Sequence, residues 1–101
     1  MGVTDQPQYL VAVIKPRLDR VEDAERHLRA LMAGTHQEPG CIYMELVISD
    51  DDPDTWLMLE KFTSRADWEA HMLTPHVIDG NRNLADLLRE PTELRFYTAK
   101  E

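Results

Sequence analysis

The sequence predicts an α+β fold in which four strands form one antiparallel sheet and helices cover one of its faces. Two observations support this prediction. Four short runs are rich in β-branched and aromatic residues, and the segments between them include stretches whose apolar residues recur every three or four positions. Because 101 residues is the size of one domain, we expect a single domain over residues 1–101 with one modest core.

The first part of the chain predicts a strand and then a helix. Residues 9–16, YLVAVIKP, are aliphatic and β-branched and end at a proline. Asp19 and Glu22 have the spacing of a helix N-terminal cap and its reciprocal partner, so we expect the helix to begin there. An apolar stripe then runs through positions 21, 24, 28, 31 and 32 until Gly34 and the turn QEPG end the helix.

The middle of the chain predicts a β-hairpin followed by a second helix. Residues 41–49 and 55–62 have the composition of strands, and the Asp- and Pro-rich sequence DDDPD between them predicts a turn. Ser64 with Asp67 three positions later predicts the start of a helix, and Pro75 is expected to end or bend it.

The last part of the chain predicts a short helix within residues 76–91 and a fourth strand over residues 92–100. The full order is then strand, helix, strand, strand, helix, strand, with the short helix before the last strand. This order is the split βαβ arrangement of ferredoxin-like folds.

The two faces of the predicted sheet differ in what could cover them. Side chains alternate across a strand, and helices can cover only one face of an antiparallel sheet. A second copy of the same sheet is the simplest cover for the other face, so we expect a homodimer through the sheet face; an open binding groove is the alternative. The residues expected on that outer face are Val11, Val13, Tyr43, Trp56, Met58 and Phe62, with Glu60 among them.

Composition excludes several classes of partner and location. The net charge is -8 and the basic residues are scattered singly, so we expect neither nucleic acid nor a membrane as a partner. The lone Cys41 cannot form a disulfide within the chain, and it is expected to be a packing residue. With no recognisable signal segment or long apolar run, the expected location is the cytoplasm.

Two segments carry a resemblance to a known family. They are EPGCIYMEL, at the turn into the second strand, and DDDPDTWLMLEKFTSRADWEAH, in which Glu60 precedes His71 by eleven positions. On these segments the chain resembles the antibiotic biosynthesis monooxygenase family, whose members are dimeric α+β barrels of ferredoxin-like subunits. The resemblance spans essentially the whole chain, but it is more specific for fold than for reaction, because the family includes oxygenases, an isomerase and haem-degrading enzymes.

The resemblance implies a monooxygenase that uses no metal, flavin or other cofactor. In the resembling oxygenases a quinol or polycyclic phenol, once deprotonated, reacts directly with molecular oxygen. The implied partners are therefore a small aromatic substrate and oxygen. Two alternatives remain open: a non-catalytic dimeric module that binds a small hydrophobic ligand, and an isomerase of the same fold. Haem degradation is disfavoured because the first strand lacks the asparagine of the haem enzymes.

His71 and Glu60 are the candidate catalytic residues. An imidazole can take a phenolic or enolic proton near neutral pH, so His71 is the expected general base; the alternative is a half-buried histidine with a structural hydrogen bond. Glu60 reaches a similar depth along the third strand, but its expected face points away from His71 unless a bulge turns it. The alternative for Glu60 is an interface carboxylate paired with an arginine such as Arg95.

Four further residues are candidates for contact with the substrate. Trp68 lies one turn before His71 and could stack on a flat ligand or fill the core. Met72 and Phe62 could line a pocket or fill it, and His76 could lie at its mouth or in an exposed loop. The histidines at positions 27, 36, 71 and 76 contain no pair spaced four residues apart, so we expect no metal site.

Overall fold

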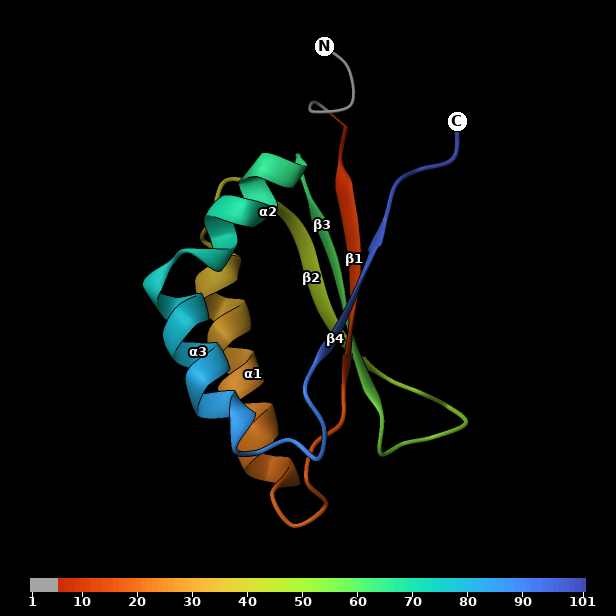
Figure 1. Cartoon of the computed structure of the whole chain (residues 1–101), viewed down its shortest axis with the longest axis vertical. Helices are drawn as coiled ribbons and strands as arrows, with labels where there is room; N and C mark the ends of the chain where they lie inside the picture. Colours follow the sequence, from red (N-terminus) through yellow and green to blue (C-terminus); the bar gives the residue numbers. More distant parts are fainter. Residues whose placement is uncertain (1–5) are drawn as a thin grey trace.

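The computed structural model describes residues 6–101, in which three helices lie on one face of a four-stranded antiparallel sheet (Figure 1). The strands follow the spatial order β2-β3-β1-β4. The predicted α+β fold and its ferredoxin-like order are confirmed. The elements are β1 (Gln8–Ile14), α1 (Val21–Thr35), β2 (Cys41–Ile48), β3 (Trp56–Phe62), α2 (Arg65–Met72), α3 (Pro75–Ala85) and β4 (Glu93–Tyr97).

Helix α1 begins at Val21, two residues after the predicted cap. Arg20 occupies the N-cap position without a side-chain cap, so the prediction of a cap at Asp19 is wrong. The reason is a turn before the helix, in which the Arg20 N–H donates to the Arg17 carbonyl at 2.9 Å. The predicted stripe does reach the core, where Ala24, Leu28 and Met32 are buried against the sheet.

The predicted start of α2 and the predicted break at Pro75 are both confirmed. The Ser64 hydroxyl accepts the Asp67 N–H at 3.1 Å, which caps α2. The Thr74 hydroxyl donates to the His71 carbonyl at 2.7 Å as α2 ends. Pro75 is the first residue of α3, a position where its fixed φ and missing N–H are tolerated. Two helices therefore meet at a sharp break between His71 and His76.

The predicted faces of β3 are reversed. Trp56, Met58 and Phe62 point towards the helices and are 5%, 2% and 0% exposed, so their assignment to the outer face is wrong. Pairing fixes this orientation, because Met58 lies opposite Ala12 of β1, whose side chain also faces the helices. Both sets of β3 side chains are largely apolar, so composition could not choose between them.

A bulge in β2 changes the face of one residue. Cys41 lies opposite Phe62, whereas Tyr43 lies opposite Lys61, and Ile42 is the extra residue between them. Cys41 therefore packs against the core, as expected for a packing residue. Burial, together with the nearby Glu38 and Glu60 carboxylates, raises the pKa of the Cys41 thiol.

In the part of the chain that the structure describes, all three helices lie on the other face of the sheet (Figure 1). The outer face carries apolar and aromatic side chains. Val11, Val13 and Tyr43 lie there as predicted, because they alternate with the buried positions of β1 and β2. The side chains that alternate with the buried set in β1 and β3 are half-buried: Tyr9, Val11, Val13, Leu57, Leu59 and Lys61.

Within residues 6–101 no helix is long and apolar enough to cross a membrane.

Candidate functional site

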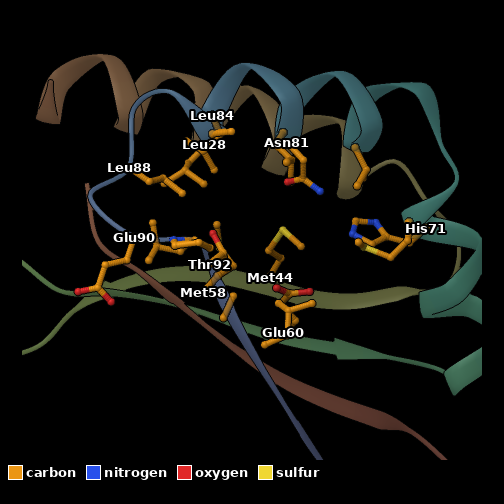
Figure 2. Close-up of a pocket in the computed structure, with 18 of the residues that line it drawn as sticks. Leu28, Met44, Met58, Glu60, His71, Asn81, Leu84, Leu88, Glu90 and Thr92 are labelled. Atoms are coloured by element: carbon orange, nitrogen blue, oxygen red, sulfur yellow. The ribbon is translucent and has the colours of Figure 1, made fainter. Parts of the chain in front are cut away.

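A cavity of about 480 Å³ lies between the helices and the sheet (Figure 2). Ala12, Met44 and Met58 form part of its floor on the sheet, and Leu28 and Leu84 come from the helices above. This volume falls within the range of roughly 300–1,000 Å³ that small-molecule sites occupy. The wall is mostly apolar, so the few polar groups that border the cavity would determine its chemistry.

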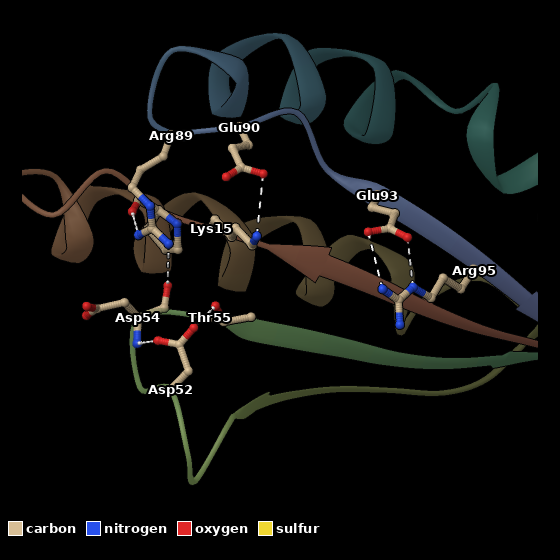
Figure 3. A network of polar contacts seen from close by, with 9 residues as sticks. Lys15, Asp52, Asp54, Thr55, Arg89, Glu90, Glu93 and Arg95 are labelled. Atoms are coloured by element: carbon tan, nitrogen blue, oxygen red, sulfur yellow. Dashed lines mark hydrogen bonds and ion pairs between the residues drawn. The ribbon is translucent and has the colours of Figure 1, made fainter.

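The segment after α3 borders one end of this cavity and is fixed to the sheet (Figure 3). Arg89 donates from its guanidinium to the Pro16 carbonyl at 2.6 Å and to the Asp54 carbonyl at 3.2 Å. Glu90 forms an ion pair with Lys15 at 3.4 Å. These contacts join the segment to the end of β1 and to the β2–β3 turn, so this end of the cavity has a defined wall.

Glu60 is a buried acid with no polar partner within residues 6–101. Its carboxylate points from β3 towards the helices and borders the cavity (Figure 2). The residue is 7% exposed, and among the described residues it forms no side-chain hydrogen bond or ion pair. Burial raises its pKa from 4.5 to about 7. Glu60 can therefore exchange a proton with a bound molecule near neutral pH.

The alternatives foreseen for Glu60 are both corrected by this placement. No bulge in β3 is needed to turn its side chain towards the helices, because regular pairing opposite Leu10 already does so. Arg95 is not its partner: it lies opposite Val11, on the outer face of the sheet, and pairs with Glu93 at 2.8 Å (Figure 3). Glu60 is a residue of the cavity rather than of the outer face.

His71 borders the same cavity from α2 and is 4% exposed. Its Nδ1 lies 3.0 and 3.1 Å from the two carboxylate oxygens of Glu38. An ionised carboxylate can only accept, so Nδ1 donates. Nε2 has no hydrogen-bond partner among the described residues. Every fully buried side-chain nitrogen or oxygen in that part of the chain does have one, so Nε2 is not fully buried. Nε2 therefore keeps some accessible surface, and His71 is one of the residues that border the cavity.

The other predicted contact residues divide into two groups. Trp68 and Met72 border the cavity, and Trp68 also packs edge-on against Phe96 with ring centroids 4.8 Å apart. Phe62 is fully buried and is not among the residues that border the cavity; its ring centroid lies 4.8 Å from that of His71. His76 also lies outside the cavity wall, where its Nε2 is 2.8 Å from Glu38.

Glu38 is the site residue that sequence reasoning did not identify. It lies in the turn between α1 and β2, where its N–H donates to the Thr35 carbonyl at 2.9 Å and its carbonyl accepts from the Cys41 N–H at 3.2 Å. The motif EPG predicts only a turn. The spacing of Glu38 and His71 gives no signal, since only the packing of this turn against α2 brings the two residues together.

Glu38, His71 and His76 are the described side chains that could hold a metal ion. Their donor atoms lie within 4.8 Å of one another, and two imidazoles with one carboxylate suit divalent transition metals. The Glu38 carboxylate already accepts a hydrogen bond from Nδ1 of His71, so a cation bound there would have to displace that proton. The expectation of no metal site rested on spacing along the chain, and it stays a prediction.

Comparison with solved structures reveals the same fold in several bacterial and archaeal proteins. Protein PA3566 of Pseudomonas aeruginosa is 28% identical, with 99% of this chain and 100% of that chain covered and a TM-score of 0.86. A conserved protein of Methanosarcina mazei is 22% identical, with 96% of both chains covered and a TM-score of 0.91. A Nitrosomonas europaea protein, provisionally named an antibiotic biosynthesis monooxygenase, is 22% identical, with 98% and 95% coverage and a TM-score of 0.88.

Sequence comparison gives the family directly. No curated protein matches the chain at a significant level. The family profile described as antibiotic biosynthesis monooxygenase matches residues 7–83, which include β1, the Glu38 turn, Glu60 and His71. The structural similarity to proteins near 20% identity supports the fold independently. The chain belongs to the antibiotic biosynthesis monooxygenase family.

Proposed function

We propose that this protein is a cofactor-independent monooxygenase that acts on a quinol or polycyclic phenol. The proposal rests on two groups that border one apolar cavity and have no hydrogen-bond partner within residues 6–101, Nε2 of His71 and the carboxyl group of Glu60. The chain belongs to the antibiotic biosynthesis monooxygenase family, which supports a monooxygenase reaction. In this proposal His71 is the general base, and Glu60 is the second acid–base group.

The cavity suits a flat aromatic molecule. Its walls are apolar on both layers, with Met58 on the sheet and Met72 and Trp68 on α2. Thioether and indole groups pack well against aromatic rings. Such walls also exclude water, which strengthens the interaction of a bound phenol with the few polar atoms present. Binding is therefore expected to place the phenolic hydroxyl at His71 or Glu60.

The proposed reaction uses electrons from the substrate alone. His71 Nε2 takes the proton of a phenolic hydroxyl, and the resulting phenolate is electron-rich at the adjacent ring carbons. One such carbon gives an electron pair to molecular oxygen, which forms a C–O bond and reduces the oxygen to a peroxide. Glu60, when protonated, supplies a proton to the distal peroxide oxygen.

The second half of the reaction breaks the peroxide. The O–O bond breaks as the ring carbon loses its hydrogen as a proton, so that a carbonyl forms and the distal oxygen leaves as hydroxide, which takes that proton to become water. Transfer of the proton on His71 to the Glu60 carboxylate then restores both groups. The balanced reaction is one quinol plus one dioxygen giving one hydroxyquinone plus one water. Proton removal by a positioned base contributes roughly 10²- to 10⁴-fold to such a rate.

We also propose a homodimer that buries the outer face of the sheet. Val11, Val13 and Leu59 lie on this face, which no helix within residues 6–101 covers. Tyr43 and Tyr97 add aromatic surface at 42% and 47% exposure. A second copy packed face to face would remove this area from water. We propose further that residues 1–101 form a single domain and that the protein is located in the cytoplasm.

Oxygen consumption tests the proposed reaction. A panel of hydroquinones, including 1,4-dihydroxynaphthalene, is added to the chelator-treated protein in an oxygen electrode. The expected result is protein-dependent uptake that falls at least about 100-fold in His71→Gln, within the range for loss of a general base. The control is His27→Gln, a histidine of α1 outside the cavity wall. Equal uptake by both variants would contradict the role of His71.

A ligand-binding module is the second candidate, and the apolar cavity favours it. In that case a small aromatic compound would change the fluorescence of Trp68 saturably while oxygen uptake stayed absent across the panel. An isomerase that used the same base would instead keep its activity under nitrogen. These three outcomes are mutually distinguishable.

A further inference from the structure

We propose that Glu38 is the positioning residue of His71. It holds the imidazole in the form that carries its proton on Nδ1, so that Nε2 is free to accept a proton from a molecule in the cavity, and its negative charge stabilises the imidazolium that results. The proposal rests on the proposed role of His71 as base. It assigns a role to a residue that lies outside the cavity wall.

The protonation pattern follows from the hydrogen bonds. Both carboxylate oxygens of Glu38 lie within 3.1 Å of Nδ1 of His71. A neutral imidazole carries one N–H, so donation from Nδ1 leaves a lone pair on Nε2. The other neutral tautomer, with its proton on Nε2, would place an N–H against the phenolic hydroxyl and the Nδ1 lone pair against the Glu38 carboxylate. It could not accept the substrate proton.

The electrostatic part depends on how Glu38 is surrounded. Its ion-pair contacts within residues 6–101 are to His71 and His76, and no lysine or arginine there lies within ion-pair distance. The carboxylate is largely buried, and a hydrogen bond between a carboxylate and an imidazolium is stronger than one between neutral groups. Glu38 can therefore respond to charge on His71 without competition from a fixed cation.

Glu38 is itself held from the other side by α3. Nε2 of His76 lies 2.8 Å from the same carboxylate oxygen, Oε2, that contacts His71. The His76 ring can come this close to α1 because residue 34 is glycine, where a Cβ atom would lie only 2.9 Å from the ring. The backbone N–H and carbonyl of Glu38 are also hydrogen-bonded, so the carboxylate is supported from several sides. Such support is what keeps a catalytic base in its productive geometry.

The first test needs no substrate. In protein labelled with ¹⁵N-histidine, the ring nitrogen shifts of neutral His71 at pH 8 should report a protonated Nδ1 and an unprotonated Nε2. Glu38→Ala should shift most of the population to the Nε2–H form, whereas Glu38→Gln, which keeps a carbonyl acceptor, should retain more of the Nδ1–H form. The control is Glu22→Ala, an exposed acid in the first turn of α1. An unchanged His71 spectrum in Glu38→Ala would overturn the proposal.

The second test separates positioning from binding. With 1,4-dihydroxynaphthalene, both Glu38→Ala and Glu38→Gln should lower kcat for oxygen uptake at least about tenfold, while KM stays within about twofold because Glu38 does not border the cavity. A fall in stability with kcat unchanged would show a merely structural role. If His71→Gln leaves oxygen uptake intact, the proposed function fails, whereas the ring-nitrogen spectra still decide whether Glu38 sets the form of His71.

Discussion

The Glu38 carboxylate lies 3.0 Å from Nδ1 of His71, although the two residues are 33 positions apart in the chain. The turn that carries Glu38 packs closely on the start of α2. Gly40 lies so near to α2 that a Cβ atom added to it would be 2.7 Å from the Asp67 Cβ atom. A backbone hydrogen bond from Thr63 to the Gly40 carbonyl at 2.9 Å secures the same contact. Helix α2 carries His71 to the cavity, and the packing of this turn on α2 brings the Glu38 carboxylate to it.

The buried carboxyl of Glu60 should make stability depend on pH. Burial raises its pKa from 4.5 to about 7, whereas the unfolded chain restores an ordinary value. Between these values only the folded state holds the proton, so the free energy of unfolding falls as pH rises from about 4.5 to about 7. Each unit of pKa difference corresponds to about 1.4 kcal/mol, so the total approaches about 3 kcal/mol.

Glu60→Gln should remove this dependence, because an amide does not titrate. Urea denaturation of both proteins at several values between pH 4.5 and pH 8 measures it. The variant should gain stability relative to the wild type as pH rises, by about 2–3 kcal/mol over the whole range. Parallel stability curves for the two proteins would mean that Glu60 is ionised in the folded state.

Two phenylalanines offer a matched test of where the core lies. Phe62 is 0% exposed and packs on His71, whereas Phe96 on the edge strand β4 is 38% exposed. Phe62→Ala should lower the free energy of unfolding by about 3–5 kcal/mol, and Phe96→Ala by about 1 kcal/mol. Thermal and urea unfolding measure both. Similar costs for the two would contradict the orientation of β3.

Two glycines test the close contact between α1 and α3. At Gly34 an added Cβ would lie 2.9 Å from the His76 ring, and at Gly80 it would lie 3.1 Å from the end of the Leu31 side chain, which can move. Gly80→Ala should therefore gain up to about 1 kcal/mol from helix propensity. Gly34→Ala should lose that gain and displace His76 from Glu38. Urea unfolding of both variants measures this, and equal stabilisation would contradict the contact.

The proposed dimer can be separated by a charge on the outer face. Val11 is half-buried at the middle of β1, opposite Leu59 of β3, so Val11→Asp should place an unpaired carboxylate in the interface. Sedimentation velocity should give about twice the chain mass of 11.7 kDa for the wild type and about one chain mass for the variant. The control is Leu73→Asp, because Leu73 is 76% exposed after α2. A wild type that sediments as a single chain would contradict the dimer.

Local sequence signals predicted the elements of this fold well where a physical rule acts locally. The cap at Ser64 and the proline at position 75 fix the ends of α2 and the start of α3, and both lie where the sequence indicates. The predicted cap of α1 at Asp19 is wrong because residues 17–20 form a turn, closed by the Arg20 N–H and the Arg17 carbonyl, and the helix begins only after it. Such a turn depends on neighbouring carbonyl groups rather than on residue type.

The site was harder to predict, because it depends on contacts between distant segments. The face of Glu60 is set by the register of β3 on β1, and the two sets of β3 side chains are too similar in composition to reveal it. His71, Trp68 and Met72 were predicted as site residues from one helical segment, and all three border the cavity; their roles stay predictions. Glu38 was missed because its role exists only once the α1–β2 turn packs on α2.

The central claim is that a phenol bound in the cavity loses its proton to His71. The most direct measurement is an anaerobic titration of 1-naphthol with the protein at pH 7.5, followed by the absorbance of naphtholate. We predict saturable formation of naphtholate with the wild type, and binding of neutral naphthol with His71→Gln. Binding without naphtholate in either protein, or the same naphtholate signal in both, would contradict the claim.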